Sequence, residues 1–184
     1  LFIGAKARLR LRPVADDRVE RRRRAVAPHL QANALAGAEA ADQIDAPHTH
    51  IFLRAGVGGL AASVAAYARA VWGDAPKIIV VEPDAAPAFI ESIRAHGVVT
   101  TTGPVSAMGR LDCKTPSMIA LAGLARDADL FVTITEDQAA HAVAVLAEHG
   151  LTTTPSGGAG VAAALAGLAD MDADARVMVI LSEG

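Results

Sequence analysis

The sequence predicts an α/β protein with an open, mainly parallel sheet and helices on both of its faces. Three observations support this fold class. Four short runs of apolar, β-branched residues recur along the chain, helical patterns separate them, and the composition is 52% hydrophobic but only 3% aromatic. Parallel strands that are buried on both faces form continuous apolar runs, and they alternate with helices along the chain. At 184 residues, the length suits one domain with a sizeable core.

The predicted strands are the apolar runs themselves. They are THIFL, KIIVVE, LFVTI and RVMVIL, at residues 49–53, 77–82, 130–134 and 176–181. The short run VVTTT at residues 98–102 predicts one further strand.

Helical patterns fill the intervals between these strands, at residues 60–72, 86–96, 116–126, 136–149 and 160–169. An alanine-rich segment at residues 29–44 predicts a helix that ends before Pro47. Gly97 and Gly150 stand where the glycine that ends a helix belongs. The sequence Thr135-Glu136-Asp137-Gln138 has the form of a capping box, which marks the start of the fourth of these helices.

The charge distribution divides the chain into a basic arm, residues 1–35, and a domain, residues 36–184. Residues 1–24 carry nine Lys or Arg and three acidic residues, so the rest of the chain carries −9 within a total net charge of −3. The stretch RVERRRR suits an acidic partner, and a non-catalytic interaction protein that uses this arm is one alternative function. No aromatic residue lies near it to stack on bases, so nucleic-acid binding is not favoured. We expect a mobile, solvated arm.

Several function classes are disfavoured by composition. No apolar run approaches about 18 residues without a charge, so we expect no membrane span, and the basic beginning of the chain lacks the apolar core of a signal peptide. The single cysteine, Cys113, excludes an internal disulfide and fits a cytoplasmic location. The six histidines have no metal-ligand spacing, so no metal site is predicted.

A glycine-rich loop, AGVGGL at residues 55–60, connects the first predicted strand to a small-residue helix. Glycine lets a ligand approach the main chain closely, and the N–H groups of a helix N-terminus attract a phosphate. A tight strand-to-helix turn would need the same glycines. The spacing Gly56-x-Gly58-x-x-Ala61, with Glu82 ending the next strand, also matches a Rossmann unit, in which the acid would hold the ribose of NAD.

A second small-residue loop, TTTPSGGAGV at residues 152–161, leads into the last predicted helix, and the last strand ends at Ser182. Ligands of open parallel sheets bind at the carboxyl ends of the strands. We therefore expect the two loops and Ser182 to meet at one site.

In their order along the chain, AGVGGL, the Glu82-Pro83 strand end, PSGGAG and the closing strand resemble the pyridoxal-phosphate enzymes of fold type II, the tryptophan synthase β type. Within that group FLRAGVGGLAASV, IIVVEPD, MGRLDCKTPS and VMVILSEG are most similar to the diaminopropionate ammonia-lyases, and RLDCKTPS is the most specific of these motifs. The resemblance covers about residues 36–184. It implies a pyridoxal 5′-phosphate cofactor, a small amino-acid substrate, α,β-elimination to a 2-oxo acid and ammonia, and a homodimer in the complete enzyme.

The resemblance also implies roles for individual residues. Main-chain N–H groups of the glycine loop would hold the cofactor phosphate, and these belong to Gly56, Val57, Gly58 and Gly59. Ser182 would hydrogen-bond the pyridine nitrogen. Asp112 and Cys113 would lie on a substrate-side loop, although the sequence spacing alone favours a buried Cys113 thiol.

The Schiff-base lysine of that family lies in an N-terminal segment with a Phe-Lys pair, far upstream of the glycine loop. The lysines of this chain are Lys6, Lys77 and Lys114. Lys77 begins a predicted strand, Lys114 follows the glycine loop, and Lys6 lacks a preceding aromatic residue. We therefore expect a truncated, C-terminal portion of a lyase with negligible activity on its own.

Overall fold

The computed structural model describes residues 48–182. The predicted helix at 29–44 and the basic arm lie outside this range. The centre of the fold is a four-stranded sheet with the strand order β3-β2-β1-β4. Its strands are β1 (His50–Arg54), β2 (Lys77–Pro83), β3 (Leu130–Ile134) and β4 (Val177–Val179), and every pairing is parallel. The predicted fold class and four of the five predicted strands are confirmed.

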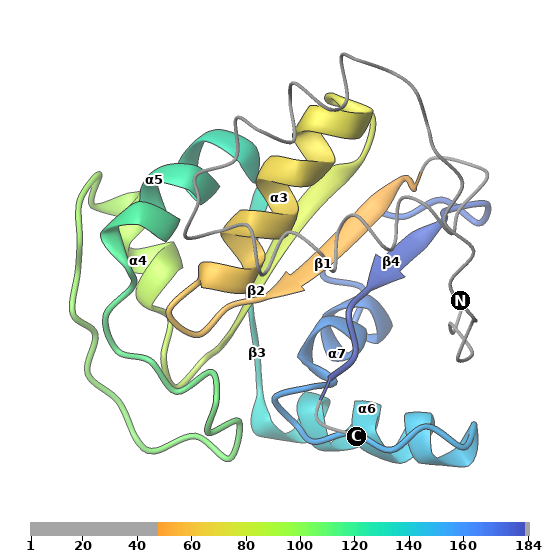
Figure 1. The fold of residues 1–184 in the computed structure, drawn as a ribbon. Coiled ribbons are helices and arrows are strands. Elements are labelled where there is room, and N and C mark those ends of the chain that lie inside the picture. The colour runs from red at the N-terminus through yellow and green to blue at the C-terminus, as the bar shows by residue number, and fades with distance from the viewer. Residues whose placement is uncertain (1–47, 183–184) are drawn as a thin grey trace.

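Because all pairings are parallel, the carboxyl ends of the four strands lie together at one end of the sheet. We call this end, where the chain leaves the strands, the carboxyl edge. Phe52 of β1 is in register with Ile79 of β2 on one side and with Val179 of β4 on the other. Val81 of β2 is in register with Val132 of β3. The glycine loop follows the carboxyl end of β1, so it lies at this edge, as does the chain that leaves β4 (Figure 1).

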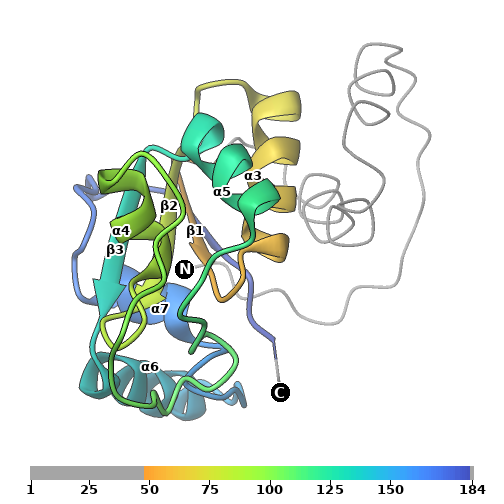
Figure 2. The same cartoon turned by 90° about the vertical axis from the view of Figure 1, so that its left-hand side faces the viewer.

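Helices cover both faces of the sheet (Figures 1 and 2). One core cluster joins Ile51, Leu53, Ile78 and Val80 to α3 (Gly59–Trp72), to α5 (Met118–Asp127) and to Phe89 of α4 (Ala88–Arg94). The second cluster joins Phe52, Ile79 and Val81 to α6 (Glu136–Glu148) and α7 (Ala159–Leu165). Successive side chains along each strand thus point to opposite faces of the sheet and belong to different core clusters. No helix within residues 48–182 is long and apolar enough to cross a membrane.

Small side chains let the helices approach closely. Seven of the fourteen residues of α3 are buried, and four of these are alanines. Gly123 of α5 lies against Ala62 of α3, since a Cβ on Gly123 would be 3.6 Å from the Ala62 Cβ. Close packing of this kind replaces the aromatic side chains that the composition lacks.

The predicted start and end of the helix at 136–149 are both confirmed. In α6, the Thr135 hydroxyl accepts from the Gln138 N–H at 3.2 Å, and the Gln138 side chain accepts from the Thr135 N–H at 2.9 Å. Gly150 follows the helix with a φ of 74°, the left-handed conformation that glycine adopts without strain.

Two predictions about the segment after α4 are wrong. Residues 98–102 form no strand, because their main chain bonds to other partners: the Val99 N–H donates to the Ser92 hydroxyl at 2.9 Å and the Thr101 N–H donates to the Lys114 carbonyl at 2.8 Å. Strand propensity depends on pairing with a neighbouring strand, and this segment pairs with none of β1 to β4. Gly97 does not end α4, since the positive φ of 53° belongs to His96.

The last predicted helix is also shorter than expected, ending at Leu165.

Candidate functional site

The glycine loop between β1 and α3 is shaped by two close approaches. Gly58 has a φ of 91°, and a Cβ on it would lie 2.2 Å from Cζ of Phe89. A Cβ on Gly56 would lie 2.6 Å from the Arg110 carbonyl oxygen. Both distances are too short for any side chain, so the two glycines are required by packing as well as by any ligand. The interpretation of this loop as a tight strand-to-helix turn therefore agrees with the packing, and it does not exclude a ligand.

The start of α3 is open. Within residues 48–182, no side chain caps α3 at Gly58, and no acidic residue lies in its first turn. The first N–H groups of a helix have no partner inside the helix, and they carry part of the positive end of the helix dipole. An anion at this point would satisfy both. In the loop before it, Val57 is exposed and Gly56 and Gly59 are partly exposed.

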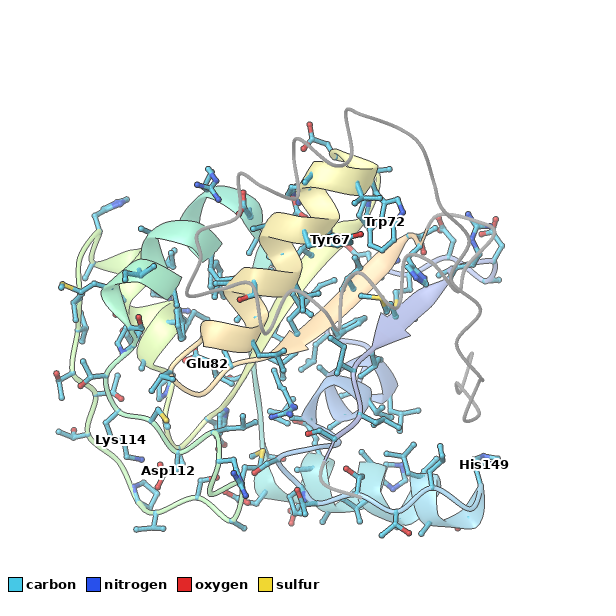
Figure 3. All side chains as sticks on the ribbon, viewed as in Figure 1. Tyr67, Trp72, Glu82, Asp112, Lys114 and His149 are labelled. Atoms are coloured by element: carbon cyan, nitrogen blue, oxygen red, sulfur yellow. The ribbon has the colours of Figure 1, made fainter. Side chains whose placement is uncertain are left out.

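Glu82 is used inside the fold, at the start of α4 (Figure 3). Its two carboxylate oxygens accept from the N–H groups of Phe89 at 2.7 Å and Ile90 at 2.9 Å, and the side chain is 1% exposed. Burial raises the pKa of Glu82 to about 7, against the opposing effect of these main-chain hydrogen bonds. A carboxylate enclosed in this way does not reach a ribose, so the NAD alternative loses the residue on which it depended.

The loop that contains RLDCKTPS lies against the glycine loop. A Cβ on Gly56 would be 3.2 Å from Cys113 Sγ, and the Ser117 N–H donates to the Val57 carbonyl at 3.1 Å. Burial raises the pKa of the half-buried Cys113 thiol, and the nearby charge of Asp112 adds to this, while the Val57 N–H opposes it. Cys113 is therefore a neutral thiol that contacts the glycine loop.

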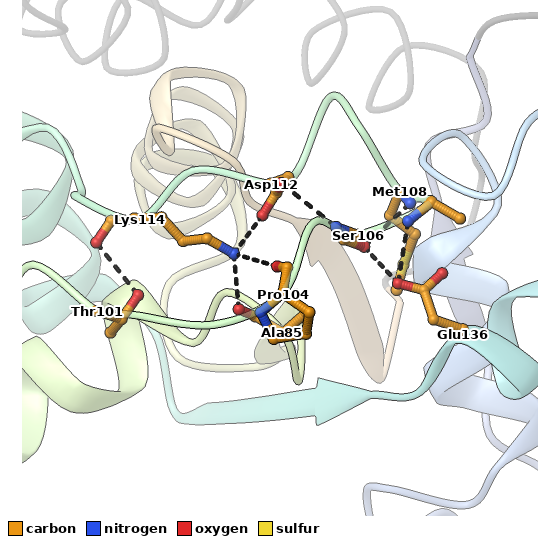
Figure 4. A network of polar contacts seen from close by, with 9 residues as sticks. Ala85, Thr101, Pro104, Ser106, Met108, Asp112, Lys114 and Glu136 are labelled. Carbon is orange, nitrogen blue, oxygen red and sulfur yellow. Dashed lines mark hydrogen bonds and ion pairs between the residues drawn. The ribbon is translucent and has the colours of Figure 1, made fainter.

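Asp112 points elsewhere, into an ion pair with Lys114 (Figures 3 and 4). The Lys114 ammonium donates to Asp112 Oδ1 at 2.5 Å and to the carbonyl oxygens of Ala85 and Pro104, each at 2.8 Å. These three acceptors match the three donors of an ammonium group. The hydrogen bond from Lys114 is the main cause that lowers the pKa of Asp112. The pair fastens this loop to the turn after β2, and it occupies the Lys114 amine.

The same loop is also bonded, through Ser106, to the start of helix α6. The Ser106 hydroxyl donates to Glu136 Oε1 at 2.6 Å, and the Ala107 N–H donates to the same oxygen at 3.1 Å (Figure 4). Farther along, the Arg110 N–H donates to the buried Ser156 hydroxyl at 3.2 Å. Ser156 belongs to the second glycine loop, so the segment around Arg110 lies between the two loops.

Ser182 follows β4 and is held from three directions. Its hydroxyl accepts a hydrogen bond from Nη2 of Arg54, and its carbonyl oxygen accepts from the Thr153 hydroxyl at 2.7 Å. Gly157 packs against the same carbonyl, where a Cβ would lie 2.1 Å from the oxygen. Arg54 ends β1, two residues before Gly56. These contacts bring Ser182 against the second glycine loop and against the end of β1, directly before the first glycine loop.

The predicted residues divide into two groups. The glycine loop, Cys113 and Ser182 lie around the carboxyl ends of β1 and β4, whereas Asp112 belongs to the ion pair with Lys114. Lys77 begins β2 and so lies at the opposite edge of the sheet.

Sequence reasoning missed Arg54 and Thr153. Arg54 had a usable signal, because it is a charged residue directly after a buried apolar run and directly before the glycines. Thr153 had none.

The fold is shared with enzymes of known structure, each of which is longer than this chain. Threonine deaminase from T.th. has a TM-score of 0.77 and 21% identity, over 84% of this chain and 56% of that one. An L-serine ammonia-lyase from the fungus Rhizomucor miehei has a TM-score of 0.76 and 24% identity, over 84% and 51%. Diaminopropionate ammonia lyase from Escherichia coli, in complex with an aminoacrylate-PLP azomethine intermediate, has a TM-score of 0.74 and 26% identity, over 84% and 44%. The chain therefore spans about half the length of these proteins.

A comparison with curated protein sequences gives no match. The family model described as "Pyridoxal-phosphate dependent enzyme" matches residues 27–183, which is most of the chain. The sequence motifs, the parallel sheet and the open glycine loop agree with this match, and the chain belongs to the family of pyridoxal-phosphate dependent enzymes.

Proposed function

We propose that this chain forms the cofactor-binding part of an ammonia-lyase of the diaminopropionate type, which eliminates the amino groups of a small amino acid to give a 2-oxo acid and ammonia. The observation that carries the proposal is the contact of the RLDCKTPS loop with the glycine loop, at the same sheet edge as Ser182. RLDCKTPS is the most specific motif of the resemblance, and the Escherichia coli enzyme is 26% identical to this chain.

The residues present fit pyridoxal phosphate. The α3 N-terminus has neither a side-chain cap nor an acid in its first turn within the described range, and Gly56 and Gly59 beside it are partly exposed. Gly56, Val57, Gly58 and Gly59 would hold the phosphate through their N–H groups. Cys113 beside them is a neutral thiol, so it brings no negative charge against the phosphate. Ser182 would contact the ring nitrogen.

When bound, pyridoxal phosphate stores the electron pair that is released when the Cα proton leaves. The chain's own contribution would be binding and orientation. A serine hydroxyl at the ring nitrogen is neutral, so it does not force a proton onto that nitrogen as a carboxylate would. The half-buried Cys113 and the loop that carries it would form one wall beside the phosphate.

Proton transfer at Cα requires a base, which in this family is the lysine that carries the cofactor. Of the lysines in residues 48–182, Lys77 lies at the far edge of the sheet and Lys114 is saturated by three acceptors. Lys6 lies outside the described residues. We therefore propose that the chain by itself binds the cofactor without covalent attachment and has no lyase activity.

Titration of the full chain with pyridoxal phosphate and with NAD tests the binding site. We expect saturable binding of pyridoxal phosphate that competes with inorganic phosphate and is weakened by Ser182→Ala, and no binding of NAD. Saturable NAD binding that Glu82→Gln weakens would contradict the proposal.

Borohydride reduction followed by peptide mass analysis tests the role of the lysines. We expect no stoichiometric pyridoxyl adduct and no release of ammonia from 2,3-diaminopropionate. An adduct on Lys6, lost together with turnover in Lys6→Ala, would show that the chain is catalytically complete.

A further inference from the structure

A charged residue contacts Ser182 without any role assigned to it. Arg54 is the last residue of β1, and its Nη2 donates to the Ser182 hydroxyl. The contact joins residues 128 positions apart, across the boundary between β1 and β4. Arg54 is half-buried, and its Nε is buried. Placing a guanidinium here costs desolvation, which a solvent-facing arginine would avoid.

The chemistry of this hydrogen bond determines what the serine can do next. A hydroxyl has one proton to donate and two lone pairs to accept with, whereas a guanidinium only donates and stays charged. Arg54 therefore occupies a lone pair of Ser182 Oγ and repels the hydroxyl proton. The O–H of Ser182 is left to point toward another acceptor.

The rest of Ser182 is fixed independently. Its carbonyl oxygen accepts from the Thr153 hydroxyl at 2.7 Å, and Gly157 packs directly against that oxygen. The main chain is thus held by the second glycine loop, and the side chain is held by Arg54. A donor fixed at both ends loses little further entropy when it binds a ligand.

We propose that Arg54 is a positioning residue, which makes the Ser182 hydroxyl a hydrogen-bond donor to an unprotonated aromatic ring nitrogen. This inference rests on the proposed cofactor site. The guanidinium acts through Ser182, and its positive charge opposes a proton on the nitrogen that Ser182 contacts. The pair selects ligands that carry an acceptor at this point of the ring.

Two ligands separate this role from a purely structural one. The first is 4′-deoxypyridoxine 5′-phosphate, which keeps the phosphate and the ring nitrogen but has no aldehyde to react with lysine. The second is its analogue with C–H in place of the ring nitrogen. Affinities of both are measured by calorimetry at pH 7 for the full chain and for Arg54→Ala, Arg54→Lys and Ser182→Ala.

We expect wild type to bind the nitrogen-containing ligand about tenfold more tightly than the analogue, the effect of one hydrogen bond. Arg54→Ala and Ser182→Ala should abolish this preference, and Arg54→Lys should restore part of it, because lysine keeps a charged donor. The matched control is Arg94→Ala, at the exposed end of α4, where the arginine pairs only with Glu91 among the contacts of the described residues. It should leave the preference unchanged.

An unchanged preference in Arg54→Ala would overturn the inference while the cofactor site stood, because a structural role weakens both ligands equally. Failure of both ligands to bind wild type would instead overturn the proposed function, and this inference with it. A second measurement needs no variant: the ¹⁵N chemical shift of the labelled ring nitrogen, bound to wild type at pH 7. We expect the shift of an unprotonated, hydrogen-bonded nitrogen, and the shift of a protonated nitrogen would contradict the role of Arg54.

Discussion

Helices α3 and α6 both follow strands of the same parallel sheet, yet they begin in opposite ways. The first turn of α6 is closed by its own residues, with the Thr135–Gln138 capping box and the acids Glu136 and Asp137. The first turn of α3 follows Gly58 and has neither a cap nor an acid among the described residues. A helix start that satisfies its own N–H groups serves the fold, whereas one that leaves them open is available to an anion.

The largest expected effect is on the free energy of unfolding, at the contact between Phe89 and Gly58 at the start of α3. Gly58→Ala should lower the free energy of unfolding by about 4 kcal/mol, because it combines left-handed backbone strain with a collision against the Phe89 ring. Urea denaturation measures this. Gly150→Ala is the matched control: its φ of 74° is also left-handed, but a Cβ there meets open space. Its cost should be about 1 kcal/mol. Equal costs at the two positions would contradict the account of the Phe89 contact.

The next effect concerns Glu82, which closes the start of α4 from strand β2. Its pKa is about 7 in the folded chain against an ordinary value of 4.5, so the folded state binds the proton more tightly than the unfolded state. This contribution is fully present below about pH 4.5 and is lost as the pH rises through about 7, by on the order of 3 kcal/mol. Glu82→Gln should remove that slope from a series of unfolding curves. A slope that persists in the variant would assign it to other groups.

Adding a negative charge to the open start should weaken phosphate binding. Val57 is 56% exposed, and Val57→Asp places a carboxylate directly before the Gly58 N-cap. We expect about tenfold weaker binding of pyridoxal phosphate, by charge repulsion and by competition for the helix N–H groups. Calorimetry measures the affinity. Val105→Asp is the control, because Val105 is 90% exposed on the loop between α4 and α5. If both variants bind equally well, the anion does not lie at α3.

The smallest effect concerns the closed start. Thr135→Ala removes one half of the capping box and should cost about 1 kcal/mol of unfolding free energy. Because α6 uses its own cap, the affinity for pyridoxal phosphate should stay the same. Thermal unfolding and a cofactor titration on the same sample check both parts. A weakened affinity would couple α6 to the site through Glu136 and Ser106.

The elements that sequence reasoning placed correctly are those with local signals. The apolar strand runs, the Thr135 capping box and Gly150 all depend on residues close in sequence. The failed strand at residues 98–102 shows the limit, since its main chain bonds to Ser92 and Lys114 and not to a strand of the sheet. The helix predicted to end at His96 ends at Arg94, and His96 adopts the left-handed conformation expected of Gly97.

The site was predictable in its parts and not in its connections. The glycines and Ser182 stand out by residue type, but the Arg54–Ser182 contact joins the end of β1 to the segment after β4, which are neighbours only in space. Likewise, Asp112 and Cys113 are adjacent in sequence, and only the fold shows that one faces Lys114 and the other faces Gly56.

The most direct test of the open helix start is a titration of the ¹⁵N-labelled chain with 4′-deoxypyridoxine 5′-phosphate, followed by amide NMR. We predict that the largest shifts occur at the N–H groups of Val57, Gly58 and Gly59, while those of Glu136 and Asp137 at the closed start of α6 stay in place. Shifts confined to other parts of the chain, or equal shifts at both helix starts, would contradict it.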